Sequence, residues 1–424
     1  MPRLPRRAAT ADDGDTAAPA RAVTSTSAGA PASIPASTGT GRNPATGVPE
    51  PRPDGGDAGE PLAKAAAPPG GAQGSGGTAG RPSYAHLSWL RVIAIVAVVA
   101  IHTTGMTMTD EGLRGSAVWW TAAIVNVGST WAVPVFVMIS GALLLGPARE
   151  GEDAVGFYRR RLARIAVPLV FWHAFYIGFK MWVKDYRPAV EKVVGDMLLA
   201  RTYTALYFFW LILGLYLLVP VLRVFLAHAS ARDRYLVTGI ALAFGLGVQI
   251  TNAYINVRQL GAPALRLTAP TYFLPYVGYF MLGYVLRDVV LTARQRVAAA
   301  LVLLLALAEL VWQHTQAADL PLDFAVALPP NTLGSVAALA AALVFLLARG
   351  TLDRGGRVGR AASDRVLGVF GCHLAVLYGM QRWFGMPDGA TTLPGLGLLL
   401  GATLAASFAI SLAAARIPLL NRAF

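Results

Sequence analysis

Long apolar runs dominate this chain from residue 85 onward. Each run is mainly hydrophobic and is close to the roughly 17 to 25 residues that an α-helix needs to cross a bilayer. The ten runs are 85–106, 118–145, 162–182, 205–226, 235–253, 270–287, 297–314, 332–348, 365–384 and 393–414. We therefore expect an all-α fold, a polytopic integral membrane helix bundle with about ten transmembrane helices.

Composition supports a membrane protein and excludes several other classes. Hydrophobic residues make up 55% of the 424 residues and charged residues only 14%, which is too apolar for an ordinary soluble protein. The net charge of +13 comes mostly from basic residues spread through short links, and no nucleic-acid module is recognisable. We expect the lipid bilayer, not nucleic acid, as the partner. Cys372 is the only cysteine, so an intrachain disulfide is impossible.

The first 83 residues differ from the rest of the chain. They are rich in Ala, Gly, Pro, Ser and Thr, contain no aromatic residue and have no apolar core of a signal peptide. Residues 1–83 are expected to form a disordered cytoplasmic tail, and residues 84–424 the transmembrane domain.

The links between the runs predict the orientation in the membrane. Links that follow even-numbered runs, together with the C-terminal segment, hold 18 Lys or Arg, and the opposite set holds nine. The positive-inside rule then places both termini in the cytoplasm. The second run is long and contains Gly and Pro, so it is expected to tilt or break. No internal repeat is evident, which disfavours a transporter built from inverted halves.

Two ionisable residues interrupt the first run, "LSWLRVIAIVAVVAIH". Arg91 and His102 are eleven residues apart, so on an α-helix they share a face and are separated by about 16 Å. An ionisable group at membrane depth is costly and is commonly functional. In the expected orientation Arg91 lies near the cytoplasm and His102 lies deeper. This pattern suits an anionic ligand that enters from inside and a proton transfer further along the helix.

That first motif resembles the opening motif of the acyltransferase family 3 membrane proteins, an arginine or lysine and a histidine with ten residues between them. Further similar segments follow in family order. They are "WAVPVFVMISGALLL" at 131–145, "RRLARIAVPLVFW" at 160–172, "GLYLLVPVL" at 214–222, "YVGYFMLGYVLR" at 276–287 and "VLGVFGCHLAVL" at 366–377. The resemblance spans the membrane region and excludes the tail.

The resemblance implies transfer of an acyl group, commonly acetyl from acetyl-CoA, to a hydroxyl of a sugar, polysaccharide or other acceptor at the cell membrane. Arg91 and His102 match the essential arginine and histidine of the family. Arg161 and Arg164 match its basic pair, which would hold the phosphates of acyl-CoA. The subgroup with similar segments includes O-acetyltransferases of bacterial surface polysaccharides. His102 would act either as general base or through an acyl-histidine intermediate.

Three segments depart from the family pattern. Ser88 replaces an aspartate that often precedes the arginine by three residues, so the usual carboxylate partner is missing. Residues 205–208 read "ALYF" where the subgroup often has His-Leu-Trp-Phe, and Phe370 replaces a tyrosine. These changes leave open a catalytically silent family member. A transporter or flippase of a lipid-linked saccharide is the other alternative.

The remaining ionisable residues in the runs have simpler interpretations. His173 and His373 are expected to be packing residues, with the better functional case for His373 because the family motif ends on it. Glu309 has no evident partner nearby in the sequence, so we expect it to be protonated or paired across helices. No cluster with metal-ligand spacing is present, and no metal is expected.

Overall fold

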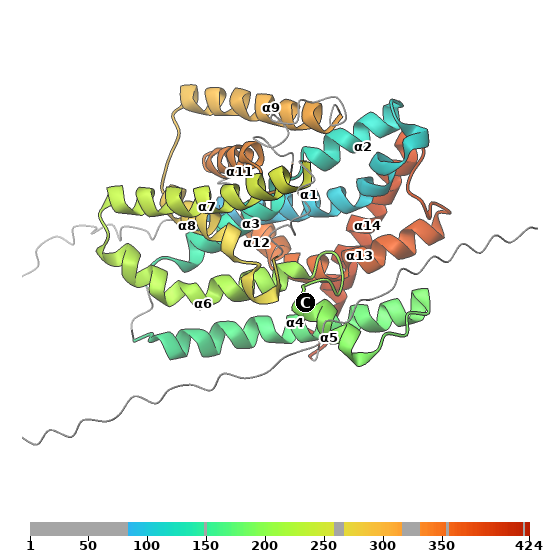
Figure 1. The fold of residues 1–424 in the computed structure, drawn as a ribbon, viewed down its shortest axis with the longest axis horizontal. Helices are drawn as coiled ribbons and strands as arrows, with labels where there is room; N and C mark the ends of the chain where they lie inside the picture. Colours follow the sequence, from blue (N-terminus) through green and yellow to red (C-terminus); the bar gives the residue numbers. More distant parts are fainter. Residues whose placement is uncertain (1–83, 148–150, 258–266, 316–330, 353–355, 419) are drawn as a thin grey trace, which may run out of the picture. The chain divides into compact units, whose positions relative to one another are not determined.

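The computed structural model describes residues 84–147, 151–257, 267–315, 331–352, 356–418 and 420–424, and all regular elements within them are helices (Figure 1). The expected tail, 1–83, lies outside the described residues. The α-helices are α1 (Ala85–Thr109), α2 (Ala117–Val127), α3 (Ala132–Leu144), α4 (Ala154–Lys184), α5 (Val190–Leu198), α6 (Tyr207–His228), α7 (Ala231–Val257), α8 (Val277–Leu286), α9 (Ala293–Thr315), α11 (Ser335–Ala348), α12 (Gly356–Ser363), α13 (Val366–Trp383) and α14 (Leu393–Ala414). Short 3₁₀ turns are η1 (Glu111–Leu113), η2 (Ala269–Thr271) and η3 (Leu274–Tyr276).

The all-helical membrane fold is confirmed, but the count of about ten membrane helices is not. Seven spans in the described part are long and apolar enough to cross a bilayer, namely α1, α2 with α3, α4, α6, α7, α9 and α14. The other three expected spans correspond to α8, α11 and α13, which have 10, 14 and 18 residues. In the run at 270–287, prolines 270 and 275 lie in the turns η2 and η3, so the α-helix begins only at Val277.

The second run breaks, as its glycine and proline content predicted. The chain turns at 128–131, between α2 and α3. The side chain of Ser116 caps the start of α2 by accepting from the N–H of Trp119 at 3.2 Å. Pro134 is the third residue of α3, where its missing N–H removes no helical hydrogen bond.

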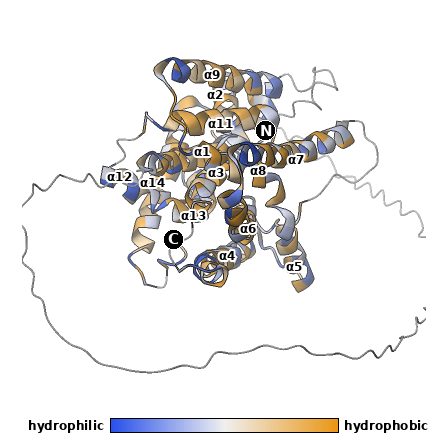
Figure 2. Ribbon diagram, turned by 90° about the vertical axis from the view of Figure 1, so that its left-hand side faces the viewer, coloured by the Kyte–Doolittle hydropathy of each residue, from blue (hydrophilic) through white to orange (hydrophobic). Residues whose placement is uncertain are grey.

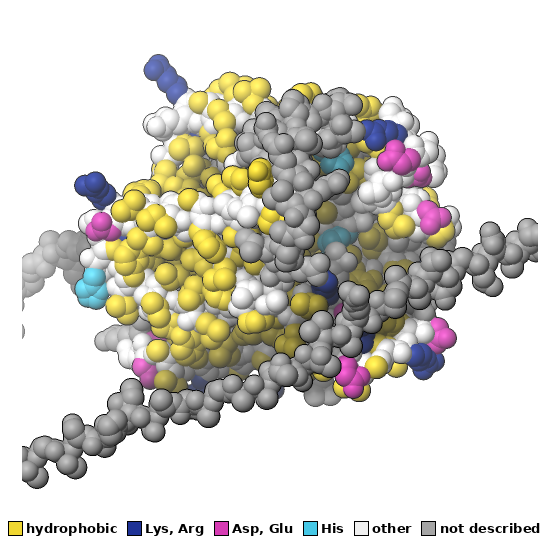
Figure 3. Space-filling model, in the orientation of Figure 1, with side chains coloured by type: hydrophobic (Ala, Val, Ile, Leu, Met, Phe, Trp, Pro, Cys, Tyr) yellow, Lys and Arg dark blue, Asp and Glu magenta, His cyan; other side chains and the backbone are white. Residues whose placement is uncertain are grey.

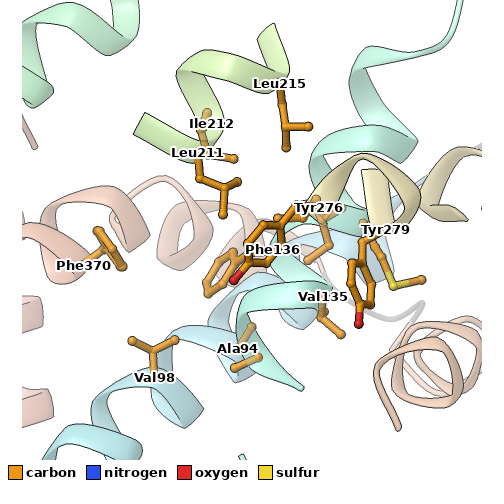
Figure 4. Close-up of a cluster of buried hydrophobic side chains, with 14 of the residues drawn as sticks. Ala94, Val98, Val135, Phe136, Leu211, Ile212, Leu215, Tyr276, Tyr279 and Phe370 are labelled. Carbon is orange, nitrogen blue, oxygen red and sulfur yellow. The ribbon is translucent and has the colours of Figure 1, made fainter. Parts of the chain in front are cut away.

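Helix α1 is the central element of the bundle. It contacts α2, α3, α11, α12, α13 and α14. Its residues Ala94 and Val98 are buried in a core that also receives Phe136 from α3 and Phe370 from α13 (Figure 4). Figure 2 shows that the helices which enclose this core are largely hydrophobic, whereas the short helix α12 is hydrophilic.

Helices α3 and α8 cross with their backbones in close approach. A Cβ atom at Gly141 of α3 would overlap the carbonyl oxygen of Phe280, and one at Gly283 of α8 would overlap that of Met138. Small residues allow such crossings, which gain packing energy where no hydrophobic effect drives helices together in lipid.

The outer surface is the one a bilayer would require. Hydrophobic side chains cover most of the face drawn in Figure 3, and the visible charged side chains gather toward its left and right edges. Helices α7 and α9 expose much of their apolar surface, and Leu305 of α9 is 70% exposed. Because exposed apolar residues on these helices would face lipid and not water, their exposure carries no penalty.

We expect Gly283→Ala to destabilise the bundle, because the added methyl group would push α8 away from α3. Overpacking of this kind costs about 1 to 3 kcal/mol, or roughly 2 to 10 °C in the thermal unfolding midpoint. Thermal unfolding of the detergent-solubilised protein measures the change. The control is Gly397→Ala in α14, where a Cβ meets no atom within 4 Å. Equal midpoints for the two variants would contradict the close crossing.

Candidate functional site

Arg91 and His102 lie on α1, which is continuous between them. Eleven residues of α-helix separate them by about 16 Å along the axis. Both side chains are half-buried, and within the described residues neither forms a hydrogen bond or an ion pair. As the sequence predicted, both side chains belong to one helix. They lie in two different parts of the bundle interior.

Arg91 opens into a pocket of about 220 Å³, here called the arginine pocket. Arg164 of α4 is its second cation, and aromatic and aliphatic side chains form most of the remaining wall. The lining residues are Arg91, Phe136, Ser140, Arg164, Ile165, Phe208, Phe209, Ile212, Tyr216, Ser363, Val366, Leu367 and Phe370. Two of the site residues expected from the sequence thus line one pocket.

The surroundings of the arginine pocket are strongly cationic. The hydroxyl of Tyr216 on α6 is close enough to interact electrostatically with Arg91, Arg161 and Arg164. Arg161 and Arg164 lie on adjacent turns of α4, so the expected basic pair and Arg91 come together. Asp364, just before α13, is the carboxylate that interacts with Arg91, but it lies beyond ion-pair distance. It supplies at long range the negative charge that Ser88 does not provide.

Arg164 also borders a second pocket, of about 570 Å³, near the end of the chain. Asn421, Arg422 and Phe424 contribute to its wall, together with Asp364. The basic surface at this end of the bundle therefore extends from the arginine pocket toward the C-terminus.

Phe370 lines the arginine pocket and also contacts the ring of His373. Its ring lies 5.0 Å from Phe208 and 5.9 Å from His373, measured between ring centroids. The rings of His373 and His102 are 5.3 Å apart and inclined by 42°. We call His102 and His373 the histidine pair. Phe370 thus connects the wall of the arginine pocket to the histidine pair through ring contacts.

His173 is a packing residue with both ring nitrogens bonded. Its Nδ1 lies 2.7 Å from the carbonyl oxygen of Leu169, and its Nε2 accepts from the indole N–H of Trp210 at 3.1 Å. A carbonyl only accepts, so Nδ1 carries the hydrogen and the ring is neutral with no free nitrogen. The packing interpretation of His173 fits this geometry.

Glu309 has a local partner that the sequence analysis did not identify, while its Oε2 has no hydrogen-bond partner among the described residues. The side-chain amide of Gln313, one turn later on α9, donates to Glu309 Oε1. A residue four positions along a helix faces the same side, and this spacing was the available signal. Cys372 is buried with its Sγ 3.7 Å from the carbonyl oxygen of Ser407, consistent with a small core residue.

Sequence reasoning missed Tyr216 and Asp364. Tyr216 lies within the segment "GLYLLVPVL", which carried the resemblance, but nothing in the segment singles out the tyrosine. Asp364 is 273 positions from Arg91 in the chain, and only the packing of α12 and α13 on α1 brings them near each other. Among the described residues, no group of three or more His, Cys, Asp or Glu could hold a metal ion.

We expect Trp210→Phe to lower the stability of the bundle, because it leaves the buried Nε2 of His173 without its donor. An unpaired buried group of this kind costs about 1 to 3 kcal/mol. Thermal unfolding in detergent checks it against Trp182→Phe, whose side chain is 82% exposed. A control that unfolds as early as Trp210→Phe would show that the bond to His173 contributes nothing.

Comparison with known proteins identifies the family. The model of an acyltransferase domain, acyltransferase family 3, matches residues 84–412. Searches of the curated proteins and of the solved structures found no match. The match covers most of the chain, and with it the arginine pocket and the histidine pair. On this evidence the chain belongs to the membrane acyltransferases of family 3.

Proposed function

We propose that this acyltransferase moves an acetyl group from acetyl-CoA to a hydroxyl of a sugar, a surface polysaccharide or a similar acceptor at the cell membrane. One observation carries the proposal. Arg91 and Arg164, neither with a carboxylate at ion-pair distance among the described residues, line a pocket whose wall includes Phe370, the ring in contact with His373 of the histidine pair.

The arginine pocket suits the donor. Guanidinium groups bind phosphate oxygens in paired, charge-assisted hydrogen bonds, and CoA carries several phosphates. Arg91, Arg161 and Arg164 are therefore the residues proposed to hold them. The apolar wall contributed by Phe208, Phe209 and Ile212 suits the uncharged pantetheine arm, which leads from the phosphates to the thioester.

The histidine pair suits the chemistry. His102 lies about 16 Å along α1 from Arg91, a distance that the extended pantetheine arm can span. Rotation of the Phe370 ring would join the arginine pocket to the histidine pair. His102 then removes the proton of the acceptor hydroxyl as the oxygen attacks the thioester carbonyl. Transfer through an acyl-histidine intermediate uses the same geometry.

The proposed orientation places the arginine pocket toward the cytoplasm, with both termini inside. Contacts between the links support placing these links on one side of the membrane. The hydroxyl of Tyr84 donates to Asp288 at 3.3 Å, Arg349 pairs with Asp288 at 3.6 Å, and Arg223 pairs with Glu152 at 3.1 Å. Tyr84 precedes α1, Arg223 lies toward the end of α6, and the other residues belong to arginine-rich links. The positive-inside rule favours the cytoplasm for such a surface.

We expect the arginines and the histidine to affect different kinetic constants. Arg164→Ala should raise the KM for acetyl-CoA roughly 10- to 150-fold, because a charge-assisted hydrogen bond contributes about 1.5 to 3 kcal/mol. His102→Ala should lower kcat roughly a hundredfold or more with little change in KM, because it removes the general base. Transfer from [14C]acetyl-CoA to a cell-envelope glycan extract of the source cells measures both constants.

Matched controls exist on the same protein. Arg294→Ala removes an exposed arginine of α9, and His228→Ala removes an exposed histidine of α6, so both should leave the constants unchanged. If His102→Ala transfers acetyl at the rate of the unmodified protein, His102 is not the base. If the unmodified protein transfers no label at all, the acetyltransferase proposal fails, and translocation of a saccharide becomes the function to test.

We expect cysteine labelling to support the orientation. In a Cys372→Ser background, Glu111→Cys in η1 should react with an impermeant maleimide added outside intact cells. Ala231→Cys at the start of α7 should react only after the cells are opened. Both positions are exposed, so access to the reagent depends on the side of the membrane. The reverse pattern would invert the topology.

A further inference from the structure

His373 is buried with one ring nitrogen unsatisfied. Its side chain has no solvent exposure, and its Nδ1 lies 2.7 Å from the carbonyl oxygen of Phe370. Because a carbonyl can only accept, Nδ1 carries the hydrogen and Nε2 carries the lone pair. Nε2 has no hydrogen-bond partner among the described residues. Such a group costs about 1 to 3 kcal/mol, so its presence requires an explanation.

His173, another buried histidine that packs in this core, lacks this feature. In His173 the equivalent Nε2 is occupied by the indole N–H of Trp210. The bundle can therefore satisfy a buried histidine completely, and it does not do so at His373. The ring next to His373 is that of His102, 5.3 Å away.

Helix α4 holds the backbone of α13 on both sides of His373. The hydroxyl of Tyr176 donates to the carbonyl oxygen of Gly371 at 2.8 Å and accepts from the N–H of Ala375 at 3.3 Å. The indole of Trp172 packs so closely on Gly371 that a Cβ atom there would overlap it. These contacts fix the backbone of α13 around His373 relative to α4.

We propose that His373 is a positioning residue for His102, a role that rests on the proposed acyl transfer. When substrate is bound, Nε2 of His373 accepts a hydrogen bond from one ring N–H of His102. That bond fixes the tautomer of His102, so its other nitrogen carries the lone pair and faces the acceptor hydroxyl. A hydrogen-bonded partner that orients a catalytic histidine is a recurrent arrangement in acyl transfer, although the partner is usually a carboxylate.

His102 carries the proton from the acceptor hydroxyl to the departing thiolate, and no other proton source is needed. The acceptor hydroxyl gives its proton to the free nitrogen of His102 as its oxygen forms the C–O bond to the acyl carbon. The His102 imidazolium keeps its hydrogen bond to the neutral His373. When the C–S bond breaks, the same nitrogen returns the proton to the departing thiolate. CoA leaves as the thiol, and both histidines end neutral.

The test compares His373→Leu, His373→Gln and His173→Leu. His373→Leu should lower kcat at least about tenfold, because His102 loses its orientation, while the KM for [14C]acetyl-CoA stays within about twofold. His373→Gln should recover part of kcat, since its amide oxygen can accept from His102. His173→Leu loses comparable packing and should keep kcat per mole of folded protein. All rates use the cell-envelope glycan extract as acceptor and protein that elutes as a folded peak.

The outcomes separate this proposal from the acyl transfer itself. If the unmodified protein is active, His102→Ala is inactive and His373→Leu keeps the kcat of His173→Leu, then His373 is only a packing residue and the acyl transfer stands. Equal kcat for His373→Leu and His373→Gln also overturns the positioning role. If His373→Leu does not fold, His373→Met replaces it as the variant without an acceptor.

Discussion

An ionisable side chain inside hydrocarbon needs protein around it, and this constraint governs the placement of α1. The helix carries Arg91 and His102, and six other helices contact it. The polar groups of Tyr216 and Asp364 lie near Arg91, as does the cation of Arg161. His102 gains the ring of His373 as a neighbour. The exposed apolar surface of α7 and α9 is left to face lipid.

Much of the fold could be predicted from the apolar runs, because a helix that crosses hydrocarbon can be recognised by its length and apolar composition alone. Seven spans were identifiable in that way. The count of about ten is not confirmed, because α8 and α11 are shorter than a helix that crosses a bilayer alone, and helices packed against protein need not match its thickness. Gly283 of α8 packs on the backbone of α3, and Phe345 of α11 is almost fully buried. A hydropathy pattern cannot distinguish this kind of burial from exposure to lipid.

The site was predictable only in part. Two motifs were visible in the sequence, the spacing of Arg91 and His102 and the basic pair at Arg161 and Arg164. The three arginines lie together near Tyr216 at the arginine pocket. The place of Phe370 in the wall of the arginine pocket was not visible, because it depends on packing of α13 against Phe208 of α6. The difference between His173 and His373 was equally hidden. The indole N–H of Trp210 donates to Nε2 of His173, whereas no donor among the described residues reaches Nε2 of His373.

The α3–α8 crossing has a consequence for how the interior can open. Two backbones in direct contact, with Gly141 and Gly283 at the contact, leave no side chains whose rotation could let the helices slide. Helices α4 and α6, which line the arginine pocket together with α3, each contain an internal proline, Pro168 and Pro220, which removes one backbone hydrogen bond and permits bending. A change in the width of this pocket would therefore come from bending of α4 or α6 and not from a shift of α3 along α8.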